Sequence, residues 1–522
     1  MRANVPLWTA RLLKLAAALL ALSFLGLYLF LVFHRLQYPY ELEWMEGAHV
    51  DYVRRILAGQ PIYIRPSIEF TPFIYTPLYF YLSALVAKLT GFGLPSRGFF
   101  PLRLVSALSF LGCSAIIFCL VRRETRNWFA GLVSSCLFIA TFQITGGFAD
   151  IARVDSLFLF LFLAGAFALR RARSPAGFAV AGLLVSLSFL TKQTALFISL
   201  PLMVWALWTN RRGGLVFAGT VAVLVIGTTL AFDRASDGWY RYYVFLLPGQ
   251  HAMVPKWLLG FWVDDVLRKL FVAVALALLY LGAALRKPDK RAGFFYLSML
   301  AGMLGGAWIS RLNEGAVENV LPPAYAGLCI LLGLGLEAAE RWTAKAEADL
   351  AQWLRAGLCV ICIAQFGLLW YSPARHLPTQ ADREAYDGFI GMVSQMEGEV
   401  YMVHHGYLPA LAGKRTHAHL AAVLDVIRHP LNQADKHLIA EFEKELGGKR
   451  YPVIVLDAWE RPPGMRGNYD LVDRVFTREE AGWPVTGRQV RPQFILVPKG
   501  SSMHLRGVEP AEQPRRPTDP AE

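Results

Sequence analysis

Long apolar runs recur along the chain as far as residue 371, and polar residues gather in the short stretches between them. A helix needs about 20 predominantly apolar residues to cross a bilayer. We therefore expect about eleven transmembrane helices. The runs that predict them are roughly 12–33, 101–121, 128–145, 155–169, 176–190, 194–209, 214–232, 257–284, 292–310, 320–337 and 354–371.

Basic residues between these runs set the expected orientation, because short loops rich in Lys and Arg stay in the cytoplasm. All the basic clusters can face one side only if a further apolar run, 73–90, does not cross the membrane. That run is short and contains Pro77 and three tyrosines. We expect it to form an outer juxtamembrane helix, a depth where Tyr is common. The clusters are Arg122, Arg123 and Arg126; Arg170, Arg171 and Arg173; Arg211 and Arg212; and Arg286, Lys287, Lys290 and Arg291.

This orientation places the N-terminus in the cytoplasm and the longer loops outside. Residues 1–371 are expected to form the transmembrane domain, with 34–100 as its first outer loop. Residues 372–505 contain no spanning run and predict a small extracytoplasmic α/β domain, followed by a disordered tail at 506–522. Strands are predicted near 399–403, 453–456 and 494–497, and helices near 382–396 and 434–446. The expected fold class is an α-helical polytopic membrane protein with a small C-terminal α/β domain.

Composition agrees with this fold class and excludes several others. The chain is 55% hydrophobic and 17% charged, which is typical of a multi-pass membrane protein. Its net charge of +13 comes largely from the loop clusters, so it does not indicate nucleic-acid binding. The six cysteines all lie in apolar segments, where Cys is usually a small hydrophobe. The histidines of the C-terminal part fit no standard metal spacing, and no phosphate-cradling P-loop is present.

Several ionisable residues meet at the predicted outer face. Glu43 and Glu46 follow the first helix, Asp155 begins a later one, and Lys192 interrupts a long apolar stretch. Counting the predicted membrane crossings places Arg311 at the same face. A carboxylate in a desolvated cleft can act as a general base, and Lys or Arg can hold a phosphate. Simpler roles stay open at this point: solvated carboxylates, a helix cap at Asp155, and membrane anchors at Lys192 and Arg311.

Six short stretches keep a characteristic order between residues 12 and 335. They are Glu46-Gly47; Leu57-x-Gly59-x-x-x-Tyr63; Tyr75-Thr76-Pro77-Leu78-Tyr79; Arg153-Val154-Asp155-Ser156-Leu157; Leu190-Thr191-Lys192-Gln193; and Gly315-x-x-x-Asn319-x-x-Pro322. In these stretches the chain resembles polytopic glycosyltransferases of the GT-C superfamily, similar to the aminoarabinose transferase and protein mannosyltransferase-like group. Many members carry an Asp-Glu pair where this chain has Met45-Glu46, so Glu46 is favoured as the base and Glu43 stays a candidate.

The resemblance implies an inverting transfer of a sugar from a polyprenyl-phosphate donor to a glycan, lipid or protein acceptor. The reaction would take place at the outer face of the plasma (inner) membrane. Glu46, Glu43 and Asp155 would be the catalytic acids, and Lys192, Arg311 and Arg153 would bind the donor phosphate. The resemblance leaves open whether Glu46 and Asp155 hold a divalent cation such as Mg²⁺ or Mn²⁺. Residues expected to contact substrate are His49, Tyr63, Tyr75, Tyr79, His251 and Asn319.

Two other functions remain alternatives to the transferase. A flippase or transporter of lipid-linked sugars should show charged residues deep within several spans and internal repeats. Neither is evident in the sequence. A non-catalytic envelope assembly protein would leave the outward carboxylates and Lys192 with capping and anchoring roles alone. The sequence identifies neither the sugar nor the acceptor.

Overall fold

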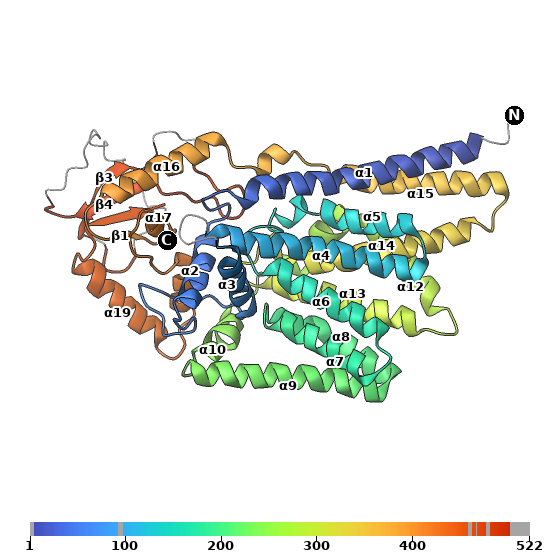
Figure 1. The fold of residues 1–522 in the computed structure, drawn as a ribbon, viewed down its shortest axis with the longest axis horizontal. Helices are drawn as coiled ribbons and strands as arrows, with labels where there is room; N and C mark the ends of the chain where they lie inside the picture. The colour runs from blue at the N-terminus through green and yellow to red at the C-terminus, as the bar shows by residue number, and fades with distance from the viewer. Residues whose placement is uncertain (1–4, 92–97, 458–461, 466, 477–480, 502–522) are drawn as a thin grey trace.

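The computed structural model describes residues 5–91, 98–457, 462–465, 467–476 and 481–501. Long helices run side by side along one axis, and a small domain with a sheet covers one end of this bundle (Figure 1). The first described residues lie at the opposite end (Figure 1). The tail predicted at 506–522 lies outside the described residues.

Each predicted apolar run forms a helix. Seven of the described helices are long and apolar enough to cross a membrane, and the remaining ones in these runs are shorter. The chain is therefore a multi-pass membrane protein, while a total of eleven crossings stays a prediction. The helices are α1 (Val5–Leu36), α4 (Phe99–Thr125), α5 (Trp128–Ala140), α6 (Asp155–Arg171), α7 (Pro175–Phe189), α8 (Thr194–Thr209), α9 (Arg211–Ala235), α11 (Trp257–Gly260) continuing through the π-helical η5 (Phe261–Leu267) into α12 (Arg268–Leu285), α13 (Arg291–Leu312), α14 (Pro322–Thr343) and α15 (Ala348–Leu368).

Local sequence explains where several of these helices begin. The Asn127 side chain accepts hydrogen bonds from the first N–H groups of α5. Ser174 does the same for α7, and Pro175 follows it at the first helical position. Both arrangements satisfy backbone donors that a helix leaves open at its start. The short polar turns between apolar runs therefore stop one helix and start the next.

The basic clusters gather at one end of the bundle. Arg170 at the end of α6 lies 2.9 Å from the carboxylate of Glu124 at the end of α4. The indole of Trp205 near the end of α8 donates to the carbonyl of Arg291 at the start of α13. Lys14 in α1 lies over the ring of Phe129 at the start of α5. The basic clusters therefore lie at one end, as expected if run 73–90 does not cross the membrane. Which side of the membrane this end faces stays a prediction.

The ambiguous run 73–90 stays at the other end. Its helical part is α3 (Leu78–Thr90), which has 13 residues and begins directly after Pro77. The N–H of Leu78 donates to the carbonyl of Leu190, and the Tyr79 hydroxyl donates to the carbonyl of Leu102 near the start of α4. Thirteen helical residues span roughly 20 Å, less than a bilayer core of about 30 Å. This helix packs on α2 (Glu46–Leu57) and α4.

The C-terminal domain contains a four-stranded sheet in the order β1-β2-β4-β3. β1 (Val400–Met402) pairs in parallel with β2 (Val453–Leu456), whereas β4 (Phe494–Pro498) is antiparallel to both β2 and β3 (Tyr469–Arg474). The three predicted strands are found, and the predicted helices are α16 (Gln380–Gln395) and α19 (Ala434–Gly447). The sequence analysis missed β3, α18 (Leu420–Arg428) and the single turn α17 (Leu408–Leu411).

Candidate active site

A cavity of about 960 Å³ lies where the helix bundle meets the C-terminal domain. The first loop, the turn before α6, the break between α7 and α8, the turn after α13 and helix α18 all contribute to its wall. The segments that the sequence analysis expects at the outer face thus surround one space. Polar side chains on this wall include Glu43, Tyr75, Arg153, Lys192, Gln193, His251, Glu314, Asn319, Asp425, Arg428 and Arg488.

Glu43 lies on the cavity wall and is only 2% exposed. Its carboxylate accepts a hydrogen bond from the backbone N–H of Met45 and lies 3.4 Å from the Arg153 guanidinium. Burial raises the pKa of Glu43, the Arg153 charge opposes that rise, and the pKa stands at about 7. A carboxyl group with a pKa near neutrality can take up and release a proton at physiological pH, as a general base must.

The C-terminal domain helps to bury this carboxylate. Gly487 has a left-handed backbone with φ of +75°, and a Cβ at this position would lie 2.7 Å from Cγ of Glu43. The N–H of the preceding Thr486 donates to the carbonyl of Leu42. A glycine is needed here for both its backbone conformation and the close approach. The environment of Glu43 is therefore built by two regions distant in sequence.

Glu46, the acid favoured by the sequence analysis, has a different environment. Its two oxygens accept from the Arg103 guanidinium at 2.9 and 2.6 Å, and from the backbone N–H groups of Leu42 and Ala152. Burial raises the pKa of Glu46, but Arg103 and the backbone donors outweigh it and hold the pKa below its ordinary value. The side chain is fully buried and is not among the residues that line the cavity. Glu46 thus ties α2 to α4 and to the turn before α6.

Asp155 brings cationic and amide groups to the cavity wall. Lys192 Nζ lies 2.6 Å from one carboxylate oxygen, and Asn319 Nδ2 donates to the other at 3.2 Å. The Arg153 guanidinium is 3.9 Å away. Lys192, Asn319 and Arg153 all line the cavity. A carboxylate that fixes donors in this way prepares a site for an anion without reorganisation.

The resemblance leaves open a divalent cation between Glu46 and Asp155, but these two carboxylates do not fit a shared dication in this structure. Each carboxylate is already paired with a cationic side chain, Arg103 for Glu46 and Lys192 for Asp155. A dication between them would have to displace or repel those cations. No step of the reaction is therefore assigned to a metal at these residues.

Arg311 is also engaged by carboxylates. Its guanidinium lies 3.1 Å from Asp265 and 3.0 Å from Glu318, and it stacks on the Trp257 ring. The side chain is buried and is not among the residues that line the cavity, although its neighbour Ser310 is. These contacts suit a role in holding the turn after α13 in place.

The predicted substrate-contacting residues fall into two groups. Tyr75, His251 and Asn319 line the cavity, and the Tyr75 hydroxyl accepts a hydrogen bond from Arg153. Tyr63, His49 and Tyr79 are buried behind them. The Tyr63 hydroxyl donates to the carbonyl of Tyr75, which supports the cavity wall from behind.

His49 and Tyr79 pack among neighbouring side chains. The His49 ring packs against the rings of Phe73 and Phe80, and burial lowers the pKa of His49 well below its ordinary value. The Tyr79 hydroxyl is hydrogen-bonded to Ser106 within the contact between α3 and α4. Both residues position the wall of the cavity.

The sequence analysis missed two buried charged residues and the contacts that they make. Arg103 is a charged residue inside the apolar run 101–121, and such isolation was a signal that could have marked it. The second is His405, which lies between Glu41 and Asp457 and bonds to both. Burial lowers the pKa of His405, but the two carboxylates outweigh it and raise the pKa to about 10. These partners lie far apart in sequence, so no local pattern could reveal them.

Comparison with known proteins agrees with this architecture. Residues 74–232 match the family model described as dolichyl-phosphate-mannose-protein mannosyltransferase. The fold is similar to ArnT from Cupriavidus metallidurans bound to undecaprenyl phosphate, with 14% identity, a TM-score of 0.58, and coverage of 91% of this chain and 97% of that one. It is also similar to the archaeal oligosaccharyltransferase AglB from Archaeoglobus fulgidus in complex with an inhibitory peptide and a dolichol-phosphate, with 12% identity, a TM-score of 0.53, and coverage of 86% and 69%.

No curated protein matches the sequence. At these identities the solved structures show a shared fold. Together with the family model, they confirm the resemblance to the GT-C superfamily that the sequence predicts.

Proposed function

We propose that this GT-C glycosyltransferase moves a sugar from a polyprenyl-phosphate donor to a hydroxyl group of an envelope glycan, lipid or protein. The observation that carries the proposal is the pairing, on one cavity wall, of a carboxyl with a pKa of about 7 and two cationic side chains, Arg153 and Lys192. The similar ArnT and AglB structures contain undecaprenyl phosphate and dolichol-phosphate, respectively, which supports a lipid phosphate as the carrier of the donor sugar and the leaving group.

Glu43 is the general base in this proposal. Its carboxylate takes the proton of the acceptor hydroxyl as the oxygen attacks the anomeric carbon of the sugar. The new C–O bond forms as the bond from that carbon to the phosphate oxygen breaks, and the electron pair leaves with the polyprenyl phosphate. Attack opposite the leaving group inverts the configuration at the anomeric carbon. Glu46 is a positioning residue, because its carboxylate is occupied by Arg103 and backbone donors.

The cationic residues stabilise the negative charge that develops on the leaving phosphate. Lys192 supplies a compact charge and Arg153 a planar fork of donors, and both line the cavity. Asp155 holds Lys192 and Asn319 in place from behind. Arg311 acts indirectly, because its contacts with Asp265 and Glu318 fix the turn that carries Asn319.

The proposal places the cavity on the outer side of the membrane. The basic clusters lie together at the opposite end of the bundle, as Glu124–Arg170 and Trp205–Arg291 contacts indicate. Short basic loops remain cytoplasmic, so the cavity and the C-terminal domain would face outward. A lipid donor can enter from the membrane, and a polar acceptor from the aqueous side.

Transfer by membranes that contain the full-length protein and are supplied with a panel of polyprenyl-phosphate sugars tests the proposal. Glu43→Gln keeps the size of the side chain but cannot accept a proton. We expect it to lower transfer roughly 10²–10⁴-fold while protein levels are retained. The measurements are the release of free polyprenyl phosphate and the incorporation of labelled sugar into acceptor.

Glu314→Gln is the matched control, because Glu314 lines the same cavity and is exposed. It should transfer sugar at close to the wild-type rate. Wild-type transfer by the Glu43 variant would remove this residue from the chemistry. Movement of the intact donor across the membrane, without release of free polyprenyl phosphate, would favour the flippase alternative.

A further inference from the structure

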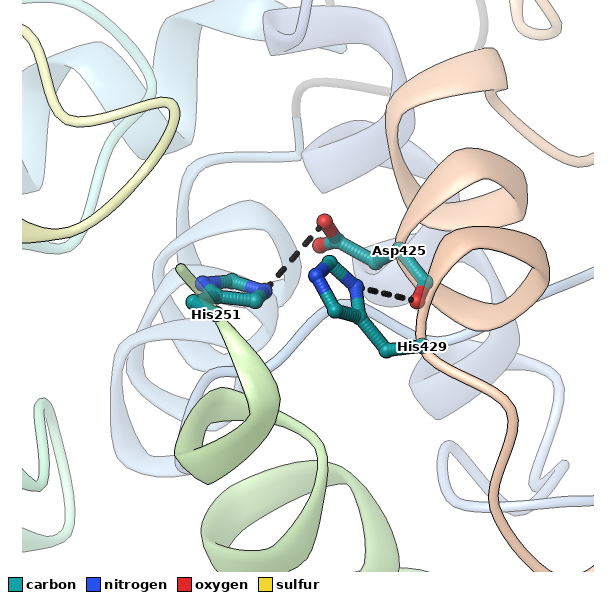
Figure 2. Close-up of side chains that lie close together, drawn as sticks. All are labelled: His251, Asp425 and His429. Carbon is teal, nitrogen blue, oxygen red and sulfur yellow. Dashed lines mark hydrogen bonds and ion pairs between the residues drawn. The ribbon is translucent and has the colours of Figure 1, made fainter. Parts of the chain in front are cut away.

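Three side chains that commonly bind metals converge at the edge of the cavity (Figure 2). His251 follows the short helix η4 (Pro248–Gln250) in the loop between α9 and α11. Asp425 lies on α18 of the C-terminal domain, and His429 follows the last residue of that helix. One potential ligand atom from each residue lies within 4.8 Å of the others. His251 and Asp425 also line the cavity.

The hydrogen bonds of the two histidines leave nitrogen atoms available. Nε2 of His251 is buried, has no hydrogen-bond partner among the described residues, and lies 3.5 Å from Oδ1 of Asp425. Nδ1 of His429 lies 3.0 Å from the backbone carbonyl of Asp425, so it carries the proton and donates there. That bond fixes the tautomer with Nε2 as the free acceptor, as a backbone carbonyl often does for a metal-bound histidine.

We propose that His251, Asp425 and His429 bind a transition-metal dication of the Zn²⁺ type. Two imidazole nitrogens and one carboxylate oxygen form a ligand set that zinc accepts, with a fourth position left for water or a ligand oxygen. Mg²⁺ and Ca²⁺ prefer oxygen ligands alone. Ligand atoms around tetrahedral zinc lie roughly 3.3 Å apart for bonds of about 2.0–2.1 Å. Small rotations of the side chains therefore bring the three atoms to zinc distance.

Neighbouring charges affect the affinity of these three residues for a dication. The rings of His251 and His429 are 4.8 Å apart. Asp425 beside them supplies a negative charge that attracts a dication. Arg428 on the same helix also lines the cavity, and its charge opposes a dication. The site should therefore bind more weakly than a fully enclosed structural zinc site.

The proposed metal would join two parts of the molecule that are distant in sequence. His251 belongs to the outer loop after α9, and Asp425 and His429 belong to the C-terminal domain. A bound ion would hold this domain against the loop beside the cavity. The inference does not depend on the proposed transfer reaction, because it concerns metal binding alone.

Zinc binding by the purified full-length protein tests the inference. The protein is stripped with a chelator, dialysed against Zn²⁺ and analysed for bound metal by mass spectrometry. We expect the wild type to retain zinc in a one-to-one ratio. His251→Ala, Asp425→Asn and His429→Ala each remove a ligand and should lower the affinity at least about 100-fold. His437→Ala is the matched control, because His437 is an exposed histidine on α19.

Thermal unfolding separates lost binding from lost folding. Zinc should raise the Tm of the wild type and of His437→Ala but not that of the three ligand variants. Without metal, the variants should have a Tm close to that of the metal-free wild type. If His251→Ala does not fold, His251→Gln is a milder replacement with which the same comparison can be made. Failure of the wild type to take up zinc at micromolar concentration would overturn the inference, as would zinc uptake by the ligand variants equal to that of the wild type.

Discussion

The two ends of the helix bundle carry charges in contrasting ways. At the basic end the pairs are partly exposed: Arg170 and Glu124 keep 26% and 22% of their side-chain surface. At the cavity end Arg103 and Glu46 are both fully buried, and Arg35 pairs with Asp150 at 1% and 2% exposure. Exposed charges cost little and serve to orient the helices. Buried pairs are costly to desolvate, so their concentration at one end indicates a rigid, preorganised site.

Among the substitutions that test this difference between the two ends, Glu46→Gln should have the largest effect, a loss of stability. The substitution leaves the Arg103 guanidinium buried beside a neutral partner, and breaking a buried pair costs roughly 3–5 kcal/mol of stability. Unfolding of the purified protein in detergent measures the loss. The double variant Glu46→Leu with Arg103→Met is the control, because it removes both charges and should recover part of the stability. Wild-type stability of Glu46→Gln would show that this pair does not hold the first loop.

If the proposed reaction is correct, Lys192→Met removes a cation that stabilises the leaving phosphate and should lower kcat roughly 10²–10³-fold. Lys192→Arg retains the charge and should lose less. Steady-state transfer assays give the values, with unfolding measurements to confirm that both variants remain folded. An equal loss in the two variants would indicate that the shape of the side chain matters more than its charge.

The pH dependence of transfer should report the protonation of Glu43. Its pKa of about 7 means that the carboxyl is protonated below neutrality and cannot take the acceptor proton. We expect kcat/KM to fall about tenfold for each pH unit below that value. Arg153→Gln removes the charge that holds this pKa down, so the fall in kcat/KM should begin at a higher pH. An unchanged pH profile in the Arg153 variant would argue against Glu43 as the titrating group.

Glu124→Gln should have the smallest effect. Its partner Arg170 is partly exposed, and such pairs contribute about 0–1 kcal/mol. Transfer should remain at the wild-type level because the residue lies at the basic end. The same unfolding and transfer assays apply. A loss of stability as large as that of Glu46→Gln would remove the distinction between the two ends.

Much of the fold could be predicted from sequence. Apolar length located the bundle helices, and the sidedness of the basic loops predicted that 73–90 stays at one end, where α3 is found. In the C-terminal domain β2 is buried throughout and reads as a continuous apolar run. By contrast, β3 carries Asp470 and Asp473 and is broken by a bulge, which weakens its alternation. Helix α18 has only nine residues, too few for a clear period.

The site was harder to predict because its chemistry depends on distant partners. Glu43 and Glu46 lie three residues apart on the same loop, and spacing alone could not separate them. Their surroundings differ because Glu46 contacts Arg103, whereas Glu43 contacts Arg153 and lies against Gly487. The sequence analysis did single out Asp155, Lys192 and Asn319, and the structure brings these three side chains together, while their roles stay a prediction.

The link from Glu41 through His405 to Asp457 has a consequence for attempts to build hybrids of this protein. One residue of the link comes from the first loop and two come from the C-terminal domain. A hybrid with the C-terminal domain of another protein would leave Glu41 buried without the His405 imidazole as its partner. Glu41 would then have to be replaced as well. The C-terminal domain is therefore not a detachable module, and exchanging it requires paired changes on both sides of the junction.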